Sequence, residues 1–186
     1  MFSDPTQGMA VLYQANCLGS VLCGLVTERQ ASTFYALCNC GIKSFDFVGK
    51  KKYRALRSPG QGTLRCVSPD RLQTYLYTGD MIGFVQVWSW DTRSLLQEFR
   101  AHARSVSTVV MRPSIHTLLT SSPDGWVKEW SCSGDLLLKL FLDGPWGVRN
   151  LWPLGKHSIM CHSPSSFSIW RLQNLYRLFN GMGYSS

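Results

Sequence analysis

Recognisable catalytic motifs are missing from this 186-residue chain. It has no Gly-x-Ser-x-Gly elbow, no phosphate-binding loop of the Gly-x-x-x-x-Gly-Lys type and no His-Glu-x-x-His metal motif. Its 4 histidines are dispersed, and the two-glycine turn at Gly60 and Gly62 is too short to hold a nucleotide. We therefore expect a protein that is not an enzyme, with no catalytic residues and no cofactor.

The chain also lacks a secretory leader and a disulfide framework. Its first residues carry no basic segment, and its 7 cysteines are an odd number at scattered positions. Such cysteines are typical of reduced thiols in the cytosol or nucleus. Cys38 and Cys40 form a close pair, but a one-residue gap without a nearby histidine is poor zinc spacing. We expect an intracellular protein, cytoplasmic or nuclear and not secreted, without a bound metal.

The stretch between Met9 and Val26 carries no charged residue and is long enough to suggest a membrane-spanning helix. However, Gly19, Ser20 and Gly24 interrupt it with residues that form turns. Two short buried strands explain the stretch better, so no membrane association is expected.

Acidic residues are few, 11 against 19 lysines and arginines, and the formal net charge is +8. Most of the excess lies between Lys43 and Arg71. Its centre is a basic patch made of Lys50, Lys51, Lys52, Arg54 and Arg57. Three interpretations stay open: a solvated hairpin tip, a surface for an acidic protein, or a site for nucleic-acid phosphates or nuclear import. Tyr53 is its one interleaved aromatic residue, which weakens the case for single-stranded nucleic acid.

Large aromatic residues, in contrast, recur at a regular interval. Trp88, Trp130 and Trp170 each close a short stretch of alternating apolar and polar residues, and Phe45 extends the series upstream. A period of about 40–45 residues, with an aromatic ending one strand of each unit, is typical of β-propeller blades.

Around Trp130 the sequence predicts four strands joined by three tight turns. Residues 122–125, Ser-Pro-Asp-Gly, form one turn, because proline sets φ, aspartate bonds its own backbone and glycine tolerates positive φ. The predicted strands are Arg104–Met111, His116–Ser121, Trp126–Trp130 and Leu136–Leu142.

The same template divides the rest of the chain. It predicts blades at approximately residues 21–57, 64–100, 104–142 and 146–180, and an extra strand at residues 9–15. The last blade begins its first strand at Gly147 and includes a fourth strand at Leu175–Phe179. Residues 1–8 are expected to be a flexible N-terminus and residues 181–186 a tail.

The pattern resembles the WD-repeat β-propeller family over about residues 9 to 180. The match is strongest around Trp130, where Ala101 and His102 stand in place of the family's Gly-His. In that family a histidine, a serine or threonine, an aspartate and the tryptophan form a hydrogen-bonded chain within each blade. The resemblance implies this structural role for His102, Thr120, Asp124 and Trp130. Burying these polar groups together satisfies each of them.

The other units depart from the family pattern. Ile82 and Pro164 occupy the aspartate position in the units of Trp88 and Trp170, and Phe45 replaces a tryptophan. We expect these three blades to rest mainly on apolar packing and not to carry the full network.

Four blades and one extra strand do not account for a closed ring of the usual seven WD blades. We therefore expect an all-β fold that is an incomplete arc, a segment or truncated form of a larger propeller. A compact four-bladed ring with a loose N-terminal tail is the alternative. An open arc exposes apolar blade faces, so we expect association with the remaining blades or with itself.

The resemblance also implies where partners bind. One rim would carry Arg100, Arg104 and Trp146, which belong to residue types enriched in interface hot spots, although Trp146 packed under its own blade is an equal alternative. The favoured function is a non-catalytic scaffold for protein–protein interaction. One alternative is a basic nucleic-acid-binding or nuclear module that uses residues 50–57. Another is a piece of a large ciliary or axonemal WD-repeat protein.

Overall fold

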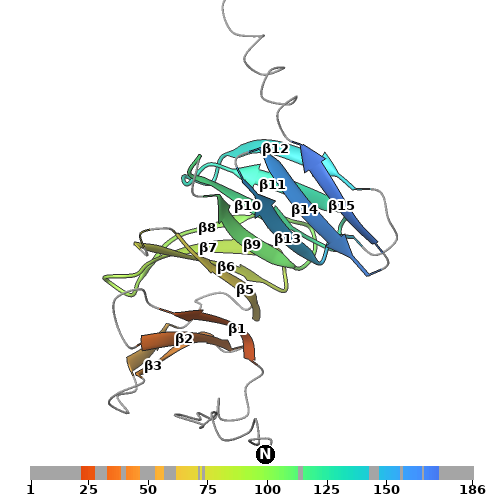
Figure 1. Cartoon of the computed structure of the whole chain (residues 1–186). Coiled ribbons are helices and arrows are strands. Elements are labelled where there is room, and N and C mark those ends of the chain that lie inside the picture. The colour runs from red at the N-terminus through yellow and green to blue at the C-terminus, as the bar shows by residue number, and fades with distance from the viewer. Residues whose placement is uncertain are drawn as a thin grey trace, which may run out of the picture.

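Strands and tight connections make up the computed structural model of this chain (Figure 1). The structure describes residues 22–27, 33–38, 41–46, 53–56, 62–70, 72, 74–112, 115–142, 147–155, 157–164 and 166–171. Within these residues it forms four antiparallel sheets, each built from strands that follow one another in the sequence. No helix in this part of the chain is long and apolar enough to span a membrane.

The four sheets have closely similar layouts. The strands of the first sheet are β1 (Leu22–Thr27), β2 (Thr33–Cys38), β3 (Gly41–Asp46) and β4 (Tyr53–Leu56). Those of the second are β5 (Leu64–Pro69), β6 (Tyr75–Asp80), β7 (Phe84–Ser89) and β8 (Leu95–Arg100). Those of the third are β9 (Thr108–Arg112), β10 (Thr117–Ser121), β11 (Trp126–Trp130) and β12 (Leu136–Phe141). The described strands of the fourth are β13 (Asn150–Leu154), β14 (Ser158–Ser163) and β15 (Ser166–Arg171).

The tight turns follow from local chemistry. Between β10 and β11, the backbone N–H of Gly125 donates to the carbonyl of Ser122 at 3.2 Å. Gly125 has a φ of 87°, a left-handed conformation that glycine adopts without steric cost. The Asp124 carboxylate accepts the N–H of Trp126 at 3.0 Å and so secures the start of β11.

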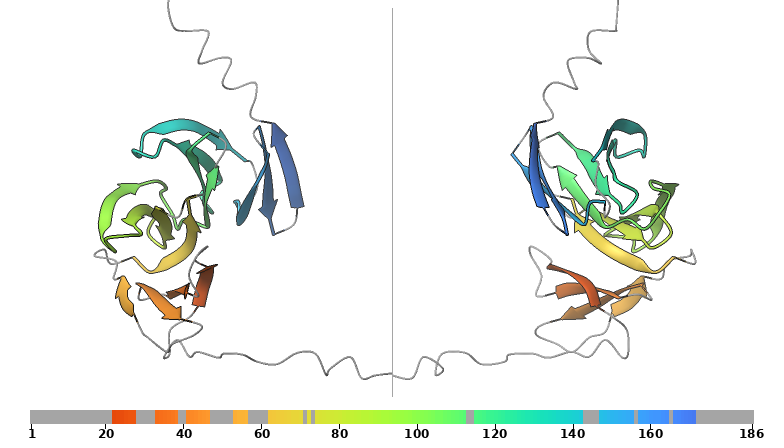
Figure 2. Two further views of the ribbon diagram at one scale, coloured as in Figure 1. Left: turned by 60° about the vertical axis from the view of Figure 1, so that its left-hand side comes forward. Right: turned by 90° about the vertical axis from the view of Figure 1, so that its right-hand side faces the viewer.

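The sheets are arranged side by side around a common axis (Figure 2). The first strands of neighbouring sheets are in contact, β1 with β5, β5 with β9 and β9 with β13. Apolar side chains fill the spaces between them because each sheet buries one face on its neighbour. The core between the first and second sheets contains Ile42, Leu64, Leu76, Trp88 and Trp90. Between the second and third sheets it includes Tyr77, Val85, Val106, Leu118 and Trp130. Between the third and fourth sheets it includes Leu119, Val127, Leu151, Ile159 and Cys161.

Two of the predicted strand starts were wrong. The first strand of the third sheet begins at Thr108 rather than at Arg104, and that of the fourth begins at Asn150 rather than at Gly147. In both cases the preceding residues bond to the neighbouring sheet first. The N–H of Val106 donates to the Asp80 carbonyl at 2.8 Å, and that of Val148 donates to the Ser122 carbonyl at 3.3 Å. These bonds between sheets delay entry into the strand.

Several predictions lie outside the described residues and stay predictions. They are the strand at residues 9–15, the fourth strand of the last unit at residues 175–179, the flexible N-terminus at residues 1–8 and the tail at residues 181–186.

Candidate protein-docking rim and its buried network

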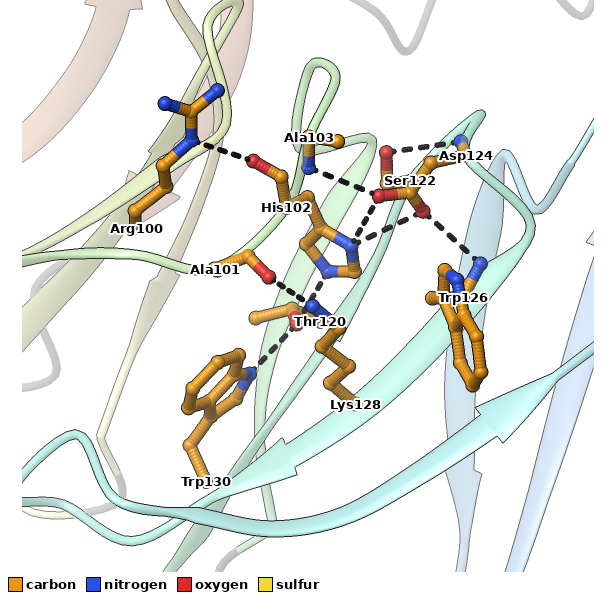
Figure 3. Close-up of polar contacts among 10 residues, drawn as sticks. All are labelled: Arg100, Ala101, His102, Ala103, Thr120, Ser122, Asp124, Trp126, Lys128 and Trp130. Carbon is orange, nitrogen blue, oxygen red and sulfur yellow. Dashed lines mark hydrogen bonds and ion pairs between the residues drawn. The ribbon is translucent and has the colours of Figure 1, made fainter.

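Four side chains of the third sheet and the connection before it form a hydrogen-bonded chain (Figure 3). Trp130 Nε1 donates to the Thr120 hydroxyl at 2.9 Å, and that hydroxyl lies 2.8 Å from His102 Nε2. His102 Nδ1 lies 3.1 Å from the nearer Asp124 carboxylate oxygen. The Thr120 hydroxyl accepts the hydrogen bond from the indole N–H, so it donates its own proton to His102 Nε2. The imidazole proton is therefore on Nδ1, facing the Asp124 carboxylate. The structure thus brings His102, Thr120, Asp124 and Trp130 together.

Asp124 connects this series of hydrogen bonds to the neighbouring loops. Its carboxylate also accepts the backbone N–H of Ala103 at 3.2 Å, which ties the β10–β11 turn to the connection between β8 and β9. The Ser122 hydroxyl in turn accepts the N–H of Asp124 at 3.2 Å. Lys128 Nζ donates to the carbonyl of Ala101 at 2.6 Å, on the other side of the same connection. The network therefore holds two loops in fixed positions at one rim.

The electrostatics of the network are those of a structural element. Burial lowers the pKa of His102 to about 4, although the nearby Asp124 carboxylate acts in the opposite direction. Burial also acts to raise the pKa of Asp124, but the N–H of Trp126, His102 and the N–H of Ala103 outweigh it, and the pKa is lowered. An Asp–His–Thr chain resembles a nucleophile with its base, but the Thr120 hydroxyl is fully buried and already binds the indole. It therefore cannot reach a substrate.

We expect the free energy of unfolding to fall as the pH falls from about 6.5 to about 4. In this interval the unfolded chain protonates its imidazole while folded His102 stays neutral, so protons favour the unfolded state. A shift of this size corresponds to about 3 kcal/mol once the pH is below both pKa values. Urea unfolding at a series of pH values measures it. The His102→Gln variant is the control and should lose this slope; equal slopes in both proteins would contradict the assignment.

At the same rim, the turn after β6 packs directly on the connection after β8. The N–H groups of Ala101 and His102 both donate to the Gly83 carbonyl, at 2.9 and 3.0 Å. Gly83 has a φ of 98°, and a β-carbon there would lie 2.2 Å from the His102 carbonyl oxygen. The close approach of the two segments therefore requires glycine at this position.

Exposed apolar and basic side chains gather on these two segments. Met81 and Ile82 in the β6–β7 turn are 47% and 48% exposed. Arg100 is exposed at the end of β8, with its guanidinium over the Phe84 ring at 6.0 Å, and Arg104 is exposed in the following connection. We call these four residues, Met81, Ile82, Arg100 and Arg104, the Ile82 rim. It includes two of the three predicted contact residues, and the third, Trp146, lies outside the described residues.

Most of the basic patch also lies outside the described residues. Of its five members, only Arg54 falls in a described strand, β4, where the backbone alone is described. Among the residues that the structure describes, no group of three or more histidine, cysteine, aspartate or glutamate side chains is arranged to hold a metal ion.

Comparison with solved structures identifies the fold of this chain. A solved structure of U3-55K aligns over 89% of this chain and 52% of its own, with a TM-score of 0.74 and 21% identity. The crystal structure of the RRP9 WD40 repeats aligns over 87% of this chain and 53% of its own, with a TM-score of 0.71 and 20% identity. The fold is an open arc of a WD-repeat β-propeller. The predicted fold class is therefore confirmed, and each sheet is a blade.

Sequence similarity covers less of the chain. No protein-family model matches it. Protein ROOT INITIATION DEFECTIVE 3 of Arabidopsis thaliana is 30% identical over 80 residues, which are 43% of this chain and 17% of that protein. Myosin heavy chain kinase C of Dictyostelium discoideum is 30% identical over 99 residues, 53% of this chain and 11% of that protein. The chain thus spans about half of the matched propeller structures and under a fifth of these curated relatives.

The second blade is more polar inside than its sequence predicted. Ile82 does stand at the family's aspartate position, but the carboxylate of Asp80, two residues earlier, accepts the N–H groups of Ile82 and Phe84 at 3.0 and 2.8 Å. Trp88 Nε1 donates to the Thr78 hydroxyl at 3.0 Å, as Trp130 does to Thr120. The family pattern did not identify Asp80 in this role, because the family's aspartate stands two residues later. From its own position the Asp80 carboxylate still accepts backbone N–H groups of the turn.

The fourth blade has a different arrangement. Its register pairs Ile159 with Trp170 and Cys161 with Ser168, so Cys161 takes the place that Thr120 has in the third blade. Trp170 Nε1 donates instead to the Ser168 hydroxyl of its own strand at 2.7 Å. Trp170 is 38% exposed, against 6% for Trp130. The tryptophan of the last blade is thus only partly enclosed.

Proposed function

We propose that this chain is a non-catalytic scaffold that binds other proteins through the Ile82 rim. One observation carries the proposal: two exposed apolar side chains and two exposed arginines lie on two segments that backbone hydrogen bonds join, and the buried network holds one of these segments, the connection after β8. Arginine combines charge with a planar group that stacks, and it is enriched among residues that dominate interface energy. Rigid loops lose little conformational freedom on binding, which favours affinity.

The partner that this rim fits is a protein segment with an apolar side chain flanked by carboxylates. The side chain would cover Met81 and Ile82, and the carboxylates would pair with Arg100 and Arg104. Because Arg100 already lies over Phe84 with its Nε 3.5 Å from the His102 carbonyl, its guanidinium is positioned before binding. Charge pairs of this kind mainly set specificity and association rate.

Quantitative affinity purification from cells tests this function. The bait is the full chain, and the rim variant carries Ile82→Asp and Arg104→Glu. Leu72→Lys is the matched control, because Leu72 is 80% exposed and lies in the β5–β6 connection away from this rim. We expect the wild type and the control to retain the same specific proteins. The rim variant should bind these proteins about tenfold more weakly, a loss of about 1.4 kcal/mol in binding free energy. Partners that bind all three baits equally would contradict the proposal.

Further parts of the proposal concern context. We propose an intracellular location, and that the chain corresponds to part of a larger propeller, supported by its coverage of 52% and 53% of the matched structures. The remaining blades of such a propeller, or a second copy of the chain, are then among its protein partners. The predicted nucleic-acid function of residues 50–57 and the predicted ciliary or axonemal origin stay alternatives. Phosphate binding would weaken steeply with salt, whereas docking on Met81 and Ile82 would not.

A further inference from the structure

The outermost strand of the third blade has one edge without a described partner. β12 pairs with β11 on one side, and no strand among the described residues pairs with its other side. Figure 1 shows β12 at the outside of its blade, away from the first strands that contact one another. This position is on the circumference of a propeller whether or not further blades complete the ring. An unpaired edge presents backbone groups that can bind another strand.

The backbone groups on this edge belong to Lys139 and Phe141. The N–H of Leu142 donates to the Gly125 carbonyl at 2.9 Å, so the backbone of Leu142 faces inward. Inward and outward positions alternate in an antiparallel ladder, and Lys139 and Phe141 therefore direct their N–H and C=O groups outward. Natural edges are usually protected by charged residues or proline, and in β12 Lys139 is the single residue of this kind.

The side chains beside this edge are aromatic and basic. The register pairs Phe141 with Trp126 and Lys139 with Lys128, so all four lie on one face of the sheet. The Trp126 and Phe141 rings have centroids 5.0 Å apart, and Lys139 Nζ lies 5.4 Å from the centroid of the Trp126 ring. Phe141 is 51% exposed, and Lys139 is exposed. We call these four residues the β12 face.

The β12 face carries two positive charges at directly opposite positions. Like charges placed in this way destabilise a sheet. In the second blade the corresponding positions hold Gln86 and Glu98, and Gln86 Nε2 donates to the Glu98 carboxylate at 2.6 Å. In the third blade neither Lys128 nor Lys139 forms an ion pair with a described residue. A carboxylate supplied from outside the blade would compensate these charges.

We propose that β12 binds an extended segment of an acidic partner protein as a fifth, antiparallel strand of the third blade. The segment carries a glutamate or aspartate opposite Lys139 and an apolar residue two positions before it, opposite Phe141. The period of two along a strand places both side chains on the β12 face. Backbone hydrogen bonds then supply affinity, and the two side chains supply specificity. A second copy of β12 is a poor occupant, because this strand has no carboxylate to offer Lys139.

Fluorescence polarisation with a labelled peptide tests the charge pairing. The probe is Ser-Thr-Leu-Thr-Glu-Thr-Thr-Ser, with a neutral fluorophore and an amidated C-terminus. We expect the wild type to bind it, and Lys139→Glu to bind it at least about tenfold more weakly, because two carboxylates then face each other. Lysine in place of the peptide's glutamate should reverse this preference. Circular dichroism checks that each variant is folded.

Two variants serve as controls for this binding. Arg65→Glu makes the same change of net charge at an exposed position of β5, and it should bind the probe as the wild type does. The Ile82 rim variant should also bind the probe normally. Failure of the β12 proposal and failure of the Ile82 rim proposal are therefore separate outcomes.

N-methylated probes test the added strand. In the antiparallel register the glutamate N–H points to the Lys139 carbonyl, whereas the N–H of the following threonine points away from β12. Methylating the glutamate nitrogen should abolish binding, and methylating that threonine nitrogen should change the affinity by less than about twofold. A wild type that does not bind the probe, equal effects of the two methyl groups, or binding unchanged by Lys139→Glu would each overturn the proposal. A wild-type dimer that the probe dissociates during size-exclusion chromatography would overturn it as well, because the occupant would then be a second copy.

Discussion

Replacing Glu129 with leucine is expected to lower the free energy of unfolding by about 3–5 kcal/mol. Glu129 of β11 and Arg112 of β9 form a buried ion pair within the third blade, with the Arg112 Nη1 nitrogen 2.8 Å from a Glu129 carboxylate oxygen. Their side chains are 0% and 1% exposed. The Thr117 hydroxyl donates to the same carboxylate oxygen at 2.5 Å. The leucine variant leaves a buried guanidinium without its carboxylate, and urea unfolding at neutral pH measures the cost.

The double variant Arg112→Met with Glu129→Leu separates the pair from the packing around it. Two buried charges lose their hydration on folding, and a well-placed pair only offsets that cost. Apolar residues of similar size need no such compensation, and the fourth blade already has Leu154 and Ile169 at the corresponding positions. We expect the double variant to recover most of the lost stability. A double variant less stable than Glu129→Leu would show that Arg112 stabilises the fold through other contacts.

Replacing Trp130 with alanine should cost about 3–5 kcal/mol as well, by a different route. The indole is 6% exposed and lies in the core between the second and third blades, with its ring centroid 5.0 Å from that of Phe99. Its removal opens a cavity and takes the donor from the Thr120 hydroxyl. Thermal and urea unfolding of the variant measure the loss, with circular dichroism as the signal.

Trp170→Ala is the matched control, because it removes the same side chain from the same repeat position. Trp170 is 38% exposed and its indole N–H bonds Ser168 of its own strand, so its removal takes away less buried apolar surface and a hydrogen bond that lies within one strand. We expect less than half of the effect of Trp130→Ala. Equal losses at the two positions would show that Trp170 contributes as much buried contact as Trp130, which would contradict its partial exposure.

Much of the fold could be predicted from the sequence because strands and tight turns depend on neighbouring residues. Alternating apolar residues at 84–89 and 126–130 predicted β7 and β11 at their observed bounds. The residues at 122–125 predicted the turn between β10 and β11. The four residues of the buried chain were identified through family resemblance, and the structure places them within hydrogen-bonding distance.

Other features depend on segments that are distant in the sequence. The strand starts at Thr108 and Asn150 are set by hydrogen bonds from Val106 and Val148 to a neighbouring blade. The burial of Arg112 with Glu129 depends on three strands in register. In the sequence each is a charged residue of a type that is usually exposed to solvent, so their burial could not be predicted. Phe167 and Ile169 likewise have the residue types of a core, but they are 72% and 62% exposed in the last described sheet.

Local chemistry therefore accounts for the strands, their turns and the repeat, because these arise from side-chain alternation and from the few residues that allow sharp backbone turns. Which faces are covered, which charges are paired and which loops meet at the Ile82 rim follow from the stacking of whole sheets. Stacking joins residues about one blade apart, and a short sequence window holds no information about which of its apolar residues find a neighbour.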